Sequence, residues 1–227
     1  GQAGPNSLVN GNITYRRQGN TSQIVYNYWS APITNGVLSS LAAPGFVPNL
    51  YQYNTANATG LDYLGTQAGW DPLTPATAMT PGRGYIATGA GLANFTGLPQ
   101  QGAVSVPAAT GAGGNNFNLL GNPYPAPISA LQFLTTNSAR LNPASIYIWD
   151  DDASGGTNYA AGDFITYSTL GTVNGPNSGL PFSGNIASCQ GFFVNHNGSG
   201  GNFTFDNSMK VYGTNSEFFD ASTVTRM

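Results

Sequence analysis

The densest cluster of charge in the sequence is an acidic run, Asp150-Asp151-Asp152, which Asp163 follows further along. Calcium prefers several hard oxygen ligands at flexible spacing, and a carboxylate-rich loop after a strand can supply them. The run lacks the fixed spacing and the terminal glutamate of an EF-hand loop. In the first half of the chain the corresponding place holds Asn54–Asn57, so the fold does not require carboxylates there. Two interpretations stay open: a calcium site, and a solvated turn held by hydrogen bonds of its own Asp and Asn side chains.

Two aromatic residues stand in loop-like surroundings where a ring could stack on a sugar. Trp70 lies in a Gly-Trp-Asp-Pro stretch, and Tyr159 lies in a segment rich in Gly and Ala. We expect both rings to be exposed, whereas Trp29 and Trp149 stand in strand-like patterns and are expected to be buried or half-buried. Arg83 lies in a tight turn between two glycines, where its guanidinium can hydrogen-bond a loop carbonyl or contact a ligand.

The residues that catalysis most often uses are few and isolated in this sequence. His196, the single histidine, stands in a segment that reads as a hairpin loop, whereas a triad would need a nucleophile and an acid beside it. Cys189, the single cysteine, has no basic neighbour in sequence that would activate its thiol. Glu217 is the single glutamate, and no two carboxylates occupy a recognisable pair of catalytic strand ends. We therefore predict that the protein is not an enzyme.

Charged residues make up 7% of the 227-residue chain, against about 25% in an ordinary soluble domain. With six Lys and Arg residues the chain cannot build the basic face that nucleic acid or an anionic membrane surface requires. No apolar run approaches the roughly 18 residues of a membrane span, and 12 Tyr, 12 Phe and 3 Trp are too many for a disordered chain. One cysteine excludes an internal disulfide. Asn, Thr, Ser, Gln and Gly replace the missing charge, which is typical of extracellular β-proteins.

Residues 29–97 and 122–205 read as two versions of one passage. The offset between corresponding residues grows along the chain, from 95 (Ile33 to Ile128) to 108 (Phe95 to Phe203), so the order is kept and the second copy carries insertions. Such a repeat indicates one supersecondary unit used twice. The corresponding segments are Ala31–Ile33 with Ala126–Ile128, Leu50–Asn54 with Ile146–Asp150, Pro81–Ala87 with Ser188–Val194, and Asn94–Thr96 with Asn202–Thr204.

The elements that must position these residues are short strands separated by turns. The strand-like runs are rich in β-branched and aromatic residues and are bounded by Gly, Pro, Asn or Asp. Thr34-Asn35 can cap a short helix over Gly36–Ala42, and Ser129 can cap one over Ala130–Thr136. The predicted strands are Ile13–Tyr15, Gln23–Trp29, Leu50–Tyr53, Gly84–Ala87, Ala103–Val106, Phe117–Leu120, Ser145–Trp149, Phe164–Tyr167, Gly191–Val194, Phe203–Phe205 and Met209–Tyr212.

A spacing of about ten residues between strands predicts an all-β fold. We expect two tandem, internally repeated units, each a β-sandwich or jelly-roll-like unit with one short helix, packed against each other. The first unit spans residues 12–106, the second spans residues 117–220, and residues 107–116 form the connecting loop. The pattern leaves open whether the units share one sandwich or form two.

Several motifs of the second unit form a set: Asn118–Pro125, Ile146–Asp150, Ile186–Val194 and Phe205–Lys210. Their counterparts in the first unit are Tyr28–Pro32 and Met79–Tyr85. As a set these motifs resemble the duplicated β-rich region of secreted surface proteins of Bacteroidota, which are substrates of type IX secretion. The resemblance covers roughly residues 12–220. It implies an extracellular, cell-surface location and no catalytic residues, and Cys189 stands where it leads us to expect a small residue, usually Gly.

Two functions follow from these features as hypotheses. The first is a non-catalytic extracellular structural protein, a surface-fibre subunit or adhesin module, that self-assembles or attaches through its tails (Gly1–Asn10 and Ser216–Met227) or its sheet edges. The alternative is a carbohydrate-binding module that uses Trp70, Tyr159 and the acidic loop, with calcium assisting. Apart from this calcium we expect no cofactor, and we expect no nucleic-acid partner and no membrane insertion.

Overall fold

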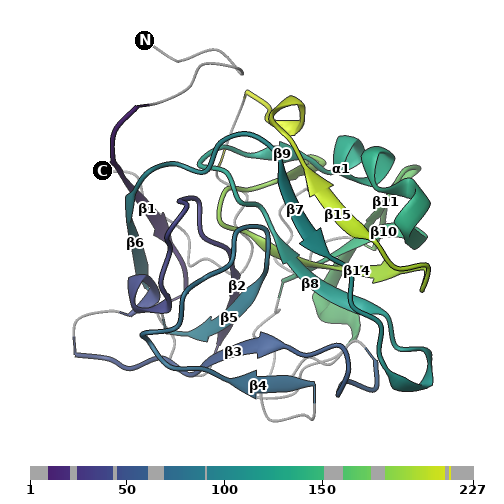
Figure 1. Cartoon of the computed structure of the whole chain (residues 1–227), viewed down its shortest axis with the longest axis horizontal. Coiled ribbons are helices and arrows are strands. Elements are labelled where there is room, and N and C mark those ends of the chain that lie inside the picture. Colours follow the sequence, from purple (N-terminus) through teal and green to yellow (C-terminus); the bar gives the residue numbers. More distant parts are fainter. Residues whose placement is uncertain are drawn as a thin grey trace.

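The computed structural model describes residues 10–20, 25–42, 45–60, 69–89, 91–150, 161–174, 182–212 and 215. These residues form strands in several sheets, with one α-helix and a number of short 3-10 turns (Figure 1). None of their helices is long and apolar enough to span a membrane. The all-β class predicted from the short strand-like runs is confirmed.

The first half of the chain builds a four-stranded antiparallel sheet in the order β2–β5–β3–β4. In this sheet Tyr51 lies opposite Ile86 on one side and opposite Pro72 on the other. Every side chain of β5 is buried, because layers of the molecule cover both faces of this central strand. The bounds are β2 (Tyr26–Trp29), β3 (Leu50–Tyr53), β4 (Trp70–Pro72) and β5 (Tyr85–Thr88).

The second half builds a five-stranded antiparallel sheet in the order β8–β14–β10–β11–β12. Here Tyr147 lies opposite Phe193 on one side and opposite Thr166 on the other. The order of β8, β14, β10 and β11 parallels that of β2, β5, β3 and β4, and β12 is added at one edge. The bounds are β8 (Phe117–Gly121), β10 (Leu141–Trp149), β11 (Phe164–Ser168), β12 (Gly171–Asn174) and β14 (Gly191–His196).

Three smaller strand pairs complete the described sheets. In the β1–β6 pair Tyr15 lies opposite Phe95, and in the β7–β15 pair Val106 lies opposite Phe203. Phe95 and Phe203 are both fully buried, each under its own pair of strands. The pairs are β1 (Ile13–Gln18) with β6 (Leu92–Gly97), β7 (Val104–Pro107) with β15 (Asn202–Phe205), and β9 (Ile128–Ser129) with β13 (Asn185–Ile186).

The helix predicted over Ala130–Thr136 is confirmed as α1, with the Ser129 hydroxyl accepting a hydrogen bond from the Gln132 N–H. The segment predicted as a helix over Gly36–Ala42 is instead a 3-10 turn, η1 (Leu38–Leu41), because Val37 is extended and pairs with Ala78. The remaining 3-10 turns are η2 (Ala112–Gly114), η3 (Ser138–Arg140), η4 (Ala161–Asp163) and η5 (Asn207–Met209).

The strand predicted over Met209–Tyr212 is wrong. Asp206 accepts a hydrogen bond from the Ser208 N–H and so caps η5, which takes up Met209. Two residues of the predicted strand still make strand-like contacts. Lys210 forms an isolated β-bridge with Ile128, and the Val211 N–H donates to the Pro127 carbonyl at 3.0 Å.

Alternate side chains of both large sheets meet in one shared aromatic layer. Tyr28 stacks on Trp149 with 5.6 Å between ring centroids and 12° between ring planes, and Phe193 packs edge-on against Tyr28 and Tyr53. Each such ring pair stabilises by about 0.5–1.5 kcal/mol beyond its buried area. We use the name aromatic layer for Tyr28, Tyr53, Ala58, Trp70, Ile86, Leu119, Trp149, Phe164 and Phe193, with Tyr26, Tyr51, Phe117 and Tyr147 at its margin.

The opposite face of each large sheet packs on a separate core. In the first core Trp29, Leu50 and Tyr85 meet Phe95 from β6 and Leu38 from η1. The second core joins the side chains of β10 and β14 to those of α1 and β15, and its largest members are Phe133, Phe192, Phe203 and Phe205. Period-two alternation along the strands produces this layering, since neighbouring residues such as Tyr28 and Trp29 point to opposite faces.

The two halves are joined by matching backbone contacts. The Ser30 N–H donates to the Cys189 carbonyl at 2.8 Å, and the Gly121 N–H donates to the Gly82 carbonyl at 3.0 Å. Gly82 and Cys189 both have positive φ, 80° and 66°, in turns that precede β5 and β14. Two bridges complete the junction, Trp29 with Gln190 and Arg83 with Leu120.

Candidate functional site

Two of the four acidic residues considered for calcium lie at the paired ends of β10 and β11. Asp150 and Asp163 have 1% and 5% of their surface exposed, and the Asp150 N–H donates to the Asp163 carbonyl at 2.7 Å. Asp151 and Asp152 lie outside the described residues. Within the part of the chain that the structure describes, no three metal-ligating side chains of the His, Cys, Asp or Glu type come together. Calcium binding at this loop stays a prediction.

Trp70 is buried, so the prediction of an exposed ring for sugar stacking is wrong. Its backbone pairs with Tyr53 at the start of β4, and 5% of its surface is exposed. Its ring packs edge-on against Tyr53 and Tyr28, with centroids 5.3 Å and 6.1 Å apart. Tyr159, the other ring considered for sugar binding, lies outside the described residues.

Arg83 lies in the turn before β5, at the junction of the two halves. Its backbone pairs with Leu120, its N–H donates to the Thr80 carbonyl at 3.1 Å, and its side chain is half-buried. The residue is on a different element from Trp70 and from the Asp150–Asp163 pair. Of the residues considered for binding, the structure thus brings together Asp150 and Asp163.

His196 and Cys189 are both held inside the fold. His196 ends β14 with 1% of its surface exposed, its Nε2 lies 3.3 Å from the Gly200 carbonyl oxygen, and its ring packs on Phe203. The loop predicted for His196 is therefore strand at that residue. Cys189 is fully buried in the first core, and burial raises the pKa of its thiol to about 12.

We expect the Cys189 thiol to resist alkylation in the folded protein at pH 8 and to react at an ordinary rate in denaturant. A thiol with a pKa of about 12 has almost no reactive thiolate at pH 8, and burial blocks access as well. The same shift removes stability as pH rises from about 9 to about 12, because only the unfolded chain loses the proton in that window. Mass spectrometry after an iodoacetamide pulse measures the rate, and equal labelling with and without denaturant would contradict the burial.

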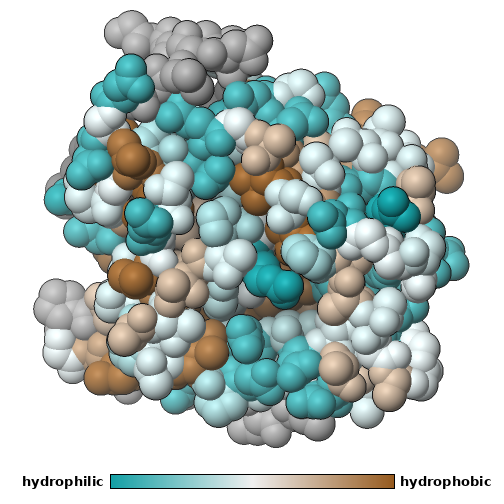
Figure 2. All heavy atoms as spheres, viewed as in Figure 1, coloured by the Kyte–Doolittle hydropathy of each residue, from teal (hydrophilic) through white to brown (hydrophobic). Residues whose placement is uncertain are grey.

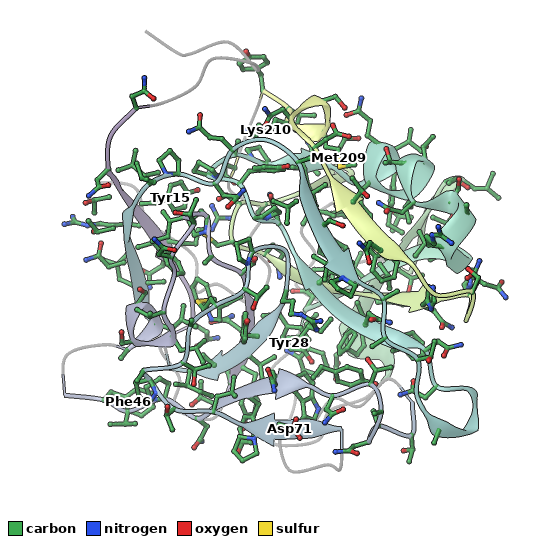
Figure 3. The ribbon with its side chains drawn as sticks, in the orientation of Figure 1. Tyr15, Tyr28, Phe46, Asp71, Met209 and Lys210 are labelled. Atoms are coloured by element: carbon green, nitrogen blue, oxygen red, sulfur yellow. The ribbon has the colours of Figure 1, made fainter. Side chains whose placement is uncertain are left out.

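A polar cluster that the sequence did not predict ties residue 215 to β1 and to the turn before β14. The Asn215 side chain accepts from the Ser188 N–H at 2.9 Å and donates to the Tyr15 hydroxyl at 2.6 Å (Figure 3). The Asn215 carbonyl accepts from the Arg17 guanidinium. Burial lowers the pKa of Arg17 and raises the pKa of Tyr15, so both groups act here as hydrogen-bonding parts of the fold.

The remaining candidate is the outer side of β6 next to η1. Three exposed aliphatic residues stand at or near β6: Leu92 begins it, Leu98 follows it and Val37 precedes η1, with exposed fractions of 50%, 48% and 37%; we call these three separate residues the β6 surface. Figure 2 shows separate apolar areas on the side of the molecule where β6 and η1 lie. Sequence reasoning treated Asn94–Thr96 as fold residues and missed this surface. The alternation of Leu92, Asn94 and Thr96 with buried Ala93 and Phe95 was the available signal.

These features define the class of protein: an all-β module of two large sheets whose strands follow a similar order. The chain belongs to a family described as a domain of unknown function (DUF8693), whose model matches residues 4–226. The matched stretch contains both large sheets. No curated protein and no solved structure matches the chain.

Proposed function

We propose that this protein is a non-catalytic structural module of the cell exterior that works by self-association or attachment. The observation that carries this proposal is the β6 surface, where aliphatic side chains are exposed on a chain with 7% charged residues. Apolar side chains gain free energy when a partner covers them, at about 25 cal/mol per Å². Little charge repulsion opposes the approach of a second molecule, because the net charge is −3.

The proposal includes an internal duplication, with residues 12–106 and 117–220 as two tandem units. The shared strand order supports it, as does the shared register: Leu50 lies opposite Ala87 as Ile146 lies opposite Val194. Hydrogen bonds recur as well, from Gln100 to the Pro32 carbonyl and from Val211 to the Pro127 carbonyl. Each half has one large sheet and a strand pair of matching place, β1–β6 in the first and β7–β15 in the second; β7 (Val104–Pro107) stands at the end of residues 12–106 and packs in the second core.

The positions of the chemically reactive side chains also favour a structural role. Cys189 fills the first core, and His196 bonds the loop that follows its own strand. Lys210 lies over the Tyr124 ring, 4.3 Å from its centroid, and burial lowers the pKa of its ammonium group (Figure 3). These groups are used in packing and hydrogen bonding. The extracellular location and the likeness to Bacteroidota surface proteins are parts of the same proposal and rest on the motifs of the sequence.

We expect the weight-average mass of the protein to rise with concentration between the micromolar and millimolar range. Since the contacts are apolar and backbone-mediated, raising the salt concentration should leave this association unchanged or strengthen it. Sedimentation equilibrium at low and high salt measures it. A protein that stays monomeric throughout, or whose association disappears in salt, would count against the proposal.

The alternative of a carbohydrate-binding module is tested by a glycan array with and without a calcium chelator. Binding that the chelator abolishes would support the alternative and the acidic loop as its site. With Trp70 in the aromatic layer, that site would have to work without one of the two rings expected to stack on sugar.

A further inference from the structure

Within the described part of the chain, the outer edge of β6 has backbone groups at alternate residues that pair with no other strand. Figure 1 shows β6 beside β1 at the margin of the molecule. The Gly91 carbonyl accepts from the Gly19 N–H, so odd-numbered residues of β6 direct their backbone groups toward β1. The backbone groups of Leu92, Asn94 and Thr96 therefore point away from β1. Among the described residues no strand pairs with this side of β6.

The open part of this edge is short and has a defined end. Beyond β6 the Leu98 carbonyl accepts from the Thr34 N–H at 3.0 Å, and the Gln100 N–H donates to the Pro32 carbonyl at 2.9 Å. The segment around Ile33 thus occupies the edge from residue 98 onward. The open stretch is Leu92–Thr96, and Asn94 is its centre.

The matching edge of β15 is closed by a side chain. The Asn137 amide donates to the Thr204 carbonyl at 3.0 Å and accepts from the Thr204 N–H at 2.8 Å, as a neighbouring strand would. Arg140 lies in space next to Gly201, the residue that precedes β15. A Cβ on Gly201 would lie 2.8 Å from the carbon of the Arg140 guanidinium. A blocked edge and a nearby charge are two devices by which proteins prevent strands from pairing between molecules.

The open stretch of β6 has neither device. It contains no charged residue and no proline, and the sequence from Gly84 to Ala139 has no charged residue at all. Its exposed side chains are Leu92, Asn94 and Thr96. Among the described residues, this edge of β6 therefore lacks the side-chain block that closes the corresponding edge of β15.

We propose that β6 pairs antiparallel with β6 of a second copy of this chain about a two-fold axis at Asn94, an inference that rests on the proposed self-association. A two-fold axis places Asn94 opposite Asn94 and Leu92 opposite Thr96, so every outward backbone group meets its complement. The two Arg16 residues, which lie opposite Asn94 on β1, stay three strand spacings apart, about 14 Å. At that distance physiological salt screens their repulsion. The pair would form a continuous sheet, β1–β6–β6–β1, flanked by the other residues of the β6 surface.

The test compares one substitution at two corresponding positions. Asn94→Lys places two ammonium groups opposite each other across the axis, whereas Asn202→Lys makes the same change on β15, next to the closed edge. Both asparagines are exposed, and the hydrogen bond that the Asn202 amide donates to Ser105 Oγ at 2.8 Å lies at the surface, so neither change should disturb the fold. We expect Asn94→Lys to weaken dimerisation about ten-fold or more and Asn202→Lys to leave it within about two-fold, by sedimentation equilibrium.

Amide hydrogen exchange by NMR supplies a second readout. We expect the amides of Leu92, Asn94 and Thr96 to exchange fast in dilute protein and to slow as the concentration rises, while those of Ala93 and Phe95 stay slow throughout. Association that Asn94→Lys does not weaken would overturn the β6 contact and leave the proposed self-association standing. Slow exchange of all five amides in the dilute monomer would mean that the chain covers this edge itself, which would also overturn it.

Discussion

Replacing Gly84 with alanine is expected to lower the free energy of unfolding by about 3 kcal/mol or more. A Cβ at this position would lie 2.5 Å from Leu119 Cγ and 2.5 Å from the Leu120 carbonyl oxygen. The carbonyl belongs to the backbone of the junction, where the Gly84 N–H donates to the Leu119 carbonyl, so neither side can move without breaking contacts between the two halves. In a chain of this length the loss corresponds to a fall in melting temperature of about 6–12 °C, measurable by circular dichroism.

Alanine substitutions at two further glycines provide comparisons for the melting temperature of Gly84→Ala. Gly60→Ala is the control, because a Cβ there meets nothing within 4 Å, and it should change the melting temperature by less than about 2 °C. Gly191 holds the corresponding position in the second half, and its Cβ would approach Tyr28 to 3.0 Å. We expect Gly191→Ala to fall between the other two. If Gly84→Ala and Gly60→Ala have the same melting temperature, β8 does not approach Gly84 as closely as the structure shows.

Replacing Asn122 with aspartate is expected to destabilise the protein by about 3–5 kcal/mol at pH 7. The Asn122 side chain is fully buried, and its Nδ2 donates to the carbonyls of Ala126, Ile186 and Ala187 at 2.8–3.2 Å. Its Oδ1 accepts from the Tyr124 N–H at 3.0 Å. Aspartate has nearly the same shape but would direct a charged oxygen at three carbonyl oxygens in a dry site. Urea unfolding at constant pH measures the loss.

The pH dependence of the Asn122→Asp variant separates this cause from a general packing defect. Burial and the facing carbonyls raise the pKa of the new carboxyl in the folded state above its unfolded value of about 3.9. The deficit relative to wild type should therefore shrink as pH falls from 7 toward 4, because the folded variant takes up a proton first. Asn202→Asp, at an exposed site, should cost less than about 1 kcal/mol. A deficit that does not depend on pH would contradict the hydrogen-bond role.

Local sequence signals predicted the elements that they specify directly. The span of α1 was predictable because Ser129 caps it and Leu134 and Phe133 face the core. Leu50–Tyr53 was predicted with its observed bounds, since a β-prone run stands between Pro and Asn residues. Trp29 and Trp149 were expected to be buried or half-buried from their strand patterns, and their exposed fractions are 0% and 1%.

The errors arose where tertiary contacts decide the outcome. Trp70 stands among residues typical of turns, but pairing with β3 turns three of them into β4 and directs the ring into the aromatic layer. Nothing local to the sequence shows this, because the rings it meets come from both halves of the chain. The sequence also did not show which strand edges are blocked. The amide of Asn137 blocks β15 at Thr204, which is far away in sequence, and the edge of β6 stands out only by comparison with that blocked edge.

The bond between Asn215 and Tyr15 has a mechanical consequence. It holds residue 215 beside β1, so two segments that lie 200 residues apart in the sequence meet at one place. If force were applied between β1 and residue 215, the hydrogen bonds of Asn215 with Tyr15, Arg17 and Ser188 would carry it first. The two cores and the aromatic layer would bear this force after those hydrogen bonds had broken.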